Sequence, residues 1–135
     1  MRYITTRIRP QQSVTNDIVV LIQADASGNS MLAQDLIDAF AQELERSDGI
    51  RITTDNGSHQ KAAYRVSIQF IPVVDCHGVI WAELFDSDGH PVWQDHKVCY
   101  DFPSGELLQN ASKELVAGLL SRLKSTTHNV DSEVQ

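Results

Sequence analysis

Apolar and polar residues alternate along several stretches of the chain and predict a sheet. Residues 64–70 place Tyr, Val, Ile and Phe at every second position, with Arg, Ser and Gln between them, which is typical of a strand with one buried and one wet face. Residues 17–24 contain an unbroken apolar run rich in β-branched side chains and predict a central strand. Residues 50–53 indicate a short strand. Residues 2–9 alternate up to Pro10 and predict an edge strand.

The middle of the chain predicts a β-hairpin. Residues 78–100 read GVIWAELFDSDGHPVWQDHKVCY, in which two runs rich in Val, Ile, Trp and Phe flank the polar residues 86–90. Gly89 stands where a tight turn needs a residue with positive φ. We therefore expect two antiparallel strands joined at this turn.

Two stretches have the spacing of amphipathic helices. In residues 31–46 and 107–124 the apolar side chains recur every three or four residues and form one stripe. Asn29 or Ser30 can cap the first helix, and Gly49 can end it in a left-handed conformation. Residues 125–135 lack this periodicity and are expected to form a flexible tail.

These elements predict an α+β fold, a two-layer sandwich with both helices on one face of a mixed, mostly antiparallel sheet of four to five strands in the order β-α-β-β-β-β-α. One helix stripe and one strand face can each bury the other in such a sandwich. The expected organisation is an amino-terminal strand and connector at residues 1–16, a single domain at residues 17–124 and the tail at residues 125–135.

Charge and hydropathy exclude two classes of partner. The chain of 135 residues has a formal net charge of -7, whereas binding to phosphate backbones or anionic lipid requires clustered Lys and Arg. We therefore expect no nucleic-acid partner. The longest apolar stretch, residues 18–22, is far shorter than the roughly 20 residues that cross a bilayer, so the chain as given is not expected to insert into a membrane.

The two cysteines lie near the open end of the predicted hairpin. If Asp86 pairs with His90, His77 lies opposite Cys99 and Cys76 lies one residue beyond, and a bulge could align the two cysteines. Four interpretations follow. They are a disulfide between the cysteines, two reduced and partly buried thiols, a zinc site that includes His77, and a catalytic cysteine paired with His77.

Other candidate chemistry is sparse. Trp81, Trp93 and His90 are candidates for partner binding, although large aromatic side chains in a sheet also serve cross-strand packing. No glycine-rich phosphate loop is present, and no catalytic motif stands out. We expect no enzymatic activity, no cofactor and no metal apart from the zinc interpretation with Cys76, His77 and Cys99 as ligands.

Residues 63–68 (AYRVSI), residues 82–93 (AELFDSDGHPVW) and the following Leu- and Ala-rich helix resemble the small α/β domain at the amino terminus of the TolB translocation protein. A related pattern occurs in the lipoproteins that activate penicillin-binding proteins. The chain departs from that pattern because Asp88 stands where a Thr is usual, Pro91 interrupts the second strand, and the lipidated Cys is absent.

The resemblance implies a non-enzymatic component of the bacterial cell envelope that binds protein partners. A homodimer is a separate expectation. Its compartment would be the periplasm or the envelope if a leader was removed, and the cytoplasm otherwise. Two alternatives stay open: a cytosolic acidic chaperone or adaptor of a secretion system, and a small Cys/His metal-binding protein.

Overall fold

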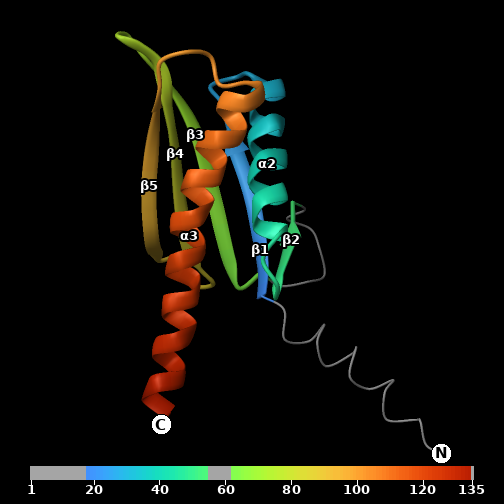
Figure 1. Ribbon diagram of the computed structural model, residues 1–135, viewed down its shortest axis with the longest axis vertical. Coiled ribbons are helices and arrows are strands. Elements are labelled where there is room, and N and C mark those ends of the chain that lie inside the picture. Colours follow the sequence, from blue (N-terminus) through green and yellow to red (C-terminus); the bar gives the residue numbers. More distant parts are fainter. Residues whose placement is uncertain (1–17, 55–61, 135) are drawn as a thin grey trace, which may run out of the picture.

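Five strands and two helices form the part of the chain that the computed structural model describes, residues 18–54 and 62–134. Both helices lie on one face of the sheet, whose other face they leave uncovered (Figure 1). This is the predicted two-layer α+β arrangement. In chain order the elements are β1 (Ile18–Asp25), α2 (Ser30–Glu45), β2 (Ile50–Thr53), β3 (Tyr64–Val73), β4 (Cys76–Asp86), β5 (Pro91–Cys99) and α3 (Gly105–Val134).

The sheet is mixed and has the strand order β2-β1-β3-β4-β5. β1 pairs in parallel with β2 and with β3. β3, β4 and β5 form an antiparallel meander, as expected from short connections. The predicted strand at residues 2–9 lies outside the described residues.

The core lies between the helices and the sheet. On α2 the predicted apolar stripe is confirmed, with Leu36, Phe40 and Leu44 fully buried. The side chain of Asn29 caps this helix, because its Oδ1 accepts a hydrogen bond from the Leu32 amide at 3.0 Å. Alternate residues of the strands complete the core from the sheet, among them Ile22, Val66, Ile68, Ile80 and Leu84.

α3 extends ten residues beyond Lys124, where the apolar periodicity ends, and continues to Val134. This differs from the loose tail expected at residues 125–135. The sequence is compatible with this extension, since neither Gly nor Pro, the two residues that disfavour a helix interior most, follows Gly118. Neither helix in the described part of the chain is long and apolar enough to cross a bilayer.

The central hairpin forms as predicted and turns at Asp86. Its Oδ1 accepts hydrogen bonds from the amides of Asp88 and His90, each at 2.9 Å. The His90 amide is the main cause that lowers the pKa of the Asp86 carboxyl. Gly89 has φ +87°, the conformation for which glycine was expected.

A register shift near this turn changes which residues of β4 and β5 lie opposite each other along the rest of the hairpin. Leu84 pairs with Trp93 whereas Phe85 pairs with Pro91, so β5 carries one extra residue there. As a result Cys99 lies opposite Gly78 and not opposite His77 as the sequence had suggested.

β5 forms one edge of the sheet, and one of its backbone amides is covered by a neighbouring side chain. The His96 amide donates a hydrogen bond to Oδ1 of Asp95 at 2.8 Å. That amide already has a hydrogen-bond acceptor in its own strand, so it is not free to pair with a further strand.

Candidate functional site

In residues 18–54 and 62–125, whose side-chain exposure the structure describes, the large hydrophobic side chains that are exposed lie at one end of the molecule. β1, β3 and β5 run toward this end, β4 begins there, and so do α2 and α3 (Figure 1). We call this group of residues the apolar end. It consists of Met31, Ile71, Val73, Val74, Val98, Tyr100 and Phe102.

The exposure at the apolar end is large. Val74 is 97% exposed in the turn between β3 and β4, Met31 is 77% exposed at the start of α2, and Tyr100 is 76% exposed after β5. Single exposed apolar residues are ordinary on a protein surface, but a concentration at one end is typical of an interaction surface.

The polar residues around the apolar end are acidic. Asp25, Asp75, Asp101 and Glu106 belong to the segments that build it, and these segments, residues 24–33, 70–79 and 98–109, contain no Lys or Arg. This end of the described structure therefore combines exposed apolar side chains with negative charge.

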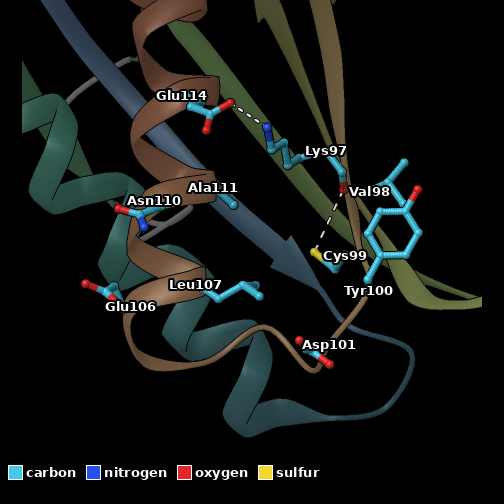
Figure 2. A pocket seen from close by; sticks show the side chains of 10 residues that line it. All are labelled: Lys97, Val98, Cys99, Tyr100, Asp101, Glu106, Leu107, Asn110, Ala111 and Glu114. Carbon is cyan, nitrogen blue, oxygen red and sulfur yellow. Dashed lines mark hydrogen bonds and ion pairs between the residues drawn. The ribbon is translucent and has the colours of Figure 1, made fainter.

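A groove of about 480 Å³ opens at this end between β5 and the first turns of α3 (Figure 2). Cys99 points from β5 into the space between the elements, and Leu107 reaches toward it from α3. Asp101 and Glu106 also line the groove, together with Tyr100. The groove thus has an apolar floor and two carboxylates beside it.

An ion pair bounds the groove on the side away from the apolar end. The Lys97 ammonium on β5 donates a hydrogen bond to a carboxylate oxygen of Glu114 on α3, and this bond is the main cause that raises the pKa of Lys97. Since Glu114 already has a cationic partner, the carboxylates available to a ligand are Asp101 and Glu106, which form no ion pair with any described residue.

The structure does not contain the disulfide, one of the four interpretations, because both cysteines are free. Cys99 lies opposite Gly78, so Cys76 is its diagonal neighbour two residues away along β4. Diagonal side chains in a sheet are about 7–8 Å apart, beyond the Cβ separation that a disulfide spans. The Cys76 thiol instead contacts the Gly78 carbonyl at 3.7 Å.

The two thiols should differ in reactivity. Burial is the main cause that raises the pKa of the Cys99 thiol, and negative charge at Cys76 raises it further. At pH 8 we expect iodoacetamide to alkylate Cys76, which is half-buried, at least about tenfold faster than Cys99. Peptide mass spectrometry at successive times measures the two rates.

Unfolding the protein in guanidinium chloride is the control, because both cysteines should then react at similar rates. Equal alkylation rates of Cys76 and Cys99 in the native protein would contradict the predicted difference in reactivity. A chain that takes up iodoacetamide at both positions only after reduction would contain the disulfide.

The three ligands of the zinc interpretation do not converge. Cys76 and His77 are adjacent in β4 and point to opposite faces of the sheet. The His77 ring contacts Phe102 edge to face, with the ring centroids 6.0 Å apart. The group that comes closest among the described residues is Asp86, Asp88 and His90, where Asp86 already bonds the turn backbone.

The aromatic candidates are placed on different faces of the sheet. Trp93 lies on the same face as the buried Leu84 and contacts Gly118 of α3, 3.4 Å from where a Cβ would stand. Trp81 lies on the uncovered face and stacks on His96, with the centroids 5.8 Å apart. The two tryptophans therefore form no common platform, and partner binding by Trp81 or by the exposed His90 stays a prediction.

The sequence reasoning missed the apolar end. Four of its residues lie outside the stretches predicted as strands or helices, namely Ile71, Val73, Val74 and Phe102, and the other three, Met31, Val98 and Tyr100, stand at the ends of such stretches. A usable signal was present nonetheless, because Val73 and Val74 follow Pro72, and Tyr100 and Phe102 precede Pro103. Large apolar residues next to a proline at the end of an element are candidates for exposed positions, because no periodic face places them in the core.

Comparison with known proteins gives the fold and no family. No protein-family model matches the chain, and no curated protein matches it. Among solved structures it is similar to a PelC dodecamer from Paraburkholderia phytofirmans, with 21% identity and a TM-score of 0.52 over 80% of this chain and 88% of that one. A hypothetical protein from Chlamydia trachomatis is similar with 9% identity and a TM-score of 0.51, over 81% of this chain and 96% of that one.

Proposed function

We propose that this chain is a non-enzymatic assembly module of the bacterial cell envelope that binds protein partners through its apolar end. The observation that carries the proposal is the concentration of the exposed large hydrophobic side chains of the described structure at that end. Removing apolar area from water favours association, so such side chains are suited to an interface.

Two further observations support parts of the proposal. The resemblance of residues 63–68 and 82–93 to the TolB domain supports the envelope as the compartment. PelC, whose structure is a dodecamer, has a similar fold, so a chain of this architecture is compatible with assembly. The groove beside β5 and α3 supplies a concave site of the kind that holds an anchoring side chain.

Site-specific photo-crosslinking tests the proposal. A photoreactive amino acid replaces Val74 or Tyr100 at the apolar end, and Asp38 or Glu45 on the outer face of α2 serves as the control position. We expect covalent protein adducts from the apolar end in the native host and none above background from the control positions. The adducted protein, once purified, should bind the wild-type chain and not the variant with Val74→Ser and Tyr100→Ser.

The result that would overturn the proposal is equal adduct formation at all four positions, or full binding of the purified partner to the doubly substituted variant. Because both substitutions remove exposed apolar area and no core contact, the variant should keep its melting temperature. A loss of binding then reports on the surface and not on folding.

A further inference from the structure

We infer that the groove between β5 and α3 binds the basic amino-terminal segment, residues 2–9, of a second copy of this chain. The inference rests on the proposed docking role of the apolar end and names the occupant of its groove.

The groove is complementary to a ligand that has both apolar and cationic groups. Its floor is formed by Cys99 and Leu107, and Tyr100 stands exposed beside it. Asp101 and Glu106 line the same groove and form no ion pair among the described residues. A guanidinium group is a suitable partner, because it pairs with a carboxylate through two parallel hydrogen bonds.

The first nine residues of the chain, MRYITTRIR, have this composition. They contain three of the 11 basic residues, and none of the 18 acidic residues precedes Asp17. Apolar side chains stand between the arginines, so one segment offers both kinds of contact. The charged and apolar residues are Arg2, Tyr3, Ile4, Arg7, Ile8 and Arg9. In a chain of net charge -7 this segment is the complement of the acidic apolar end.

The position of the segment favours a second copy over the same one. β1 begins at Ile18, at the end of the sheet opposite the groove (Figure 1). The groove lies about 30 Å from Ile18, along eight residues of β1 and across three strand spacings. The nine residues from Arg9 to Ile18 span at most about 32 Å. Arg9 would reach its own groove only through a fully extended connector, whereas the groove of a neighbour imposes no such demand.

Such a contact joins the basic end of one copy to the acidic end of the next. It is heterologous, since two different surfaces meet, and repetition produces a ring or a filament. Attraction between the two ends should weaken with added salt, because the groove carboxylates are close to solvent.

Sedimentation velocity of the full-length chain at low salt tests the inference. One variant reverses the groove, with Asp101→Lys and Glu106→Lys. A second reverses the segment, with Arg7→Glu and Arg9→Glu. We expect the wild-type chain to associate as its concentration rises, and each variant alone to associate at least about tenfold more weakly. An equimolar mixture of the two variants should associate again, because each supplies the charge that the other now needs.

The matched control carries Asp38→Lys and Glu45→Lys on α2, which changes the net charge by the same amount as the groove variant. It should associate like the wild-type chain. Circular dichroism and melting temperatures establish that every variant is folded.

Monomeric wild-type chain at all concentrations would overturn the inference, and so would equal weakening in the groove variant and the control. A mixture of the two variants that stays monomeric would overturn the second copy as the occupant. The proposed function would survive these results if the photo-crosslinks at the apolar end captured a different protein that also binds the purified chain.

Discussion

Replacing Gly78 by alanine should destabilise the protein by roughly 3 kcal/mol, the upper part of the range for overpacked cores. A Cβ at this position would lie 2.4 Å from Cζ of Phe70 and 2.7 Å from the carbonyl oxygen of Ile71. The ring can shift, but the carbonyl belongs to the neighbouring strand β3 and moves only with the sheet. Urea denaturation followed by fluorescence measures the free energy of unfolding.

Two further variants make this prediction specific. Phe70→Leu removes the ring atoms nearest to the new methyl group, so the two substitutions together should cost less than their sum. Gly118→Ala is the control, because its Cβ would make an ordinary 3.4 Å contact with Trp93. It should stabilise α3 by about 0.5–1 kcal/mol. A Gly78→Ala variant as stable as the wild-type protein would show that the strands adjust freely.

Leu36→Ala should lower the free energy of unfolding by about 3–4 kcal/mol, within the range of buried leucine truncations. Leu36 lies in the middle of α2, has no exposed surface and belongs to the main core cluster. The substitution removes three carbon atoms and leaves a cavity that the closely packed helix and sheet cannot fill completely. The expected result is a large shift of the urea midpoint with an unchanged slope.

Met31→Ala, on the same helix, is the matched comparison. Met31 is 77% exposed, so its truncation should change the free energy of unfolding by less than about 0.5 kcal/mol. It should nevertheless reduce partner capture at the apolar end. Equal destabilisation by the two substitutions would contradict the separation between the residues that hold the fold and those that dock.

The fold could be predicted from local patterns because each element has one strongly periodic face. The stripe on α2, the alternation of β3 and the turn at Gly89 all determine which side chains are buried. Together these patterns also predicted the layer arrangement, since the apolar faces of the helices and of the sheet must be buried against each other.

The details near the cysteines could not be predicted in this way. One extra residue beside Leu84 changes every pairing toward Cys99, and the sequence has no pattern that locates such a bulge. The same error placed His77, and not Gly78, opposite Cys99. A glycine stands there because a Cβ would meet the Phe70 ring and the Ile71 carbonyl.

The candidate site was missed for a different reason. Periodicity detects residues that face a core, whereas Val74 and Tyr100 face none. The groove also depends on how α3 sits over β5, an arrangement that brings Lys97 and Glu114 together although they stand 17 residues apart in the chain.

The hydrogen bond from the His96 amide to Asp95 occupies one backbone donor of β5, an edge strand of the sheet. Strands at the edge of a sheet readily recruit further strands, which leads to continuous sheets and fibrils. On β5 one amide in the middle of the edge is already occupied, and the Asp95 carboxylate beside it repels acidic neighbours. Contacts made at the ends of the molecule do not use this edge, so an assembly built through them would not require strands of different copies to pair.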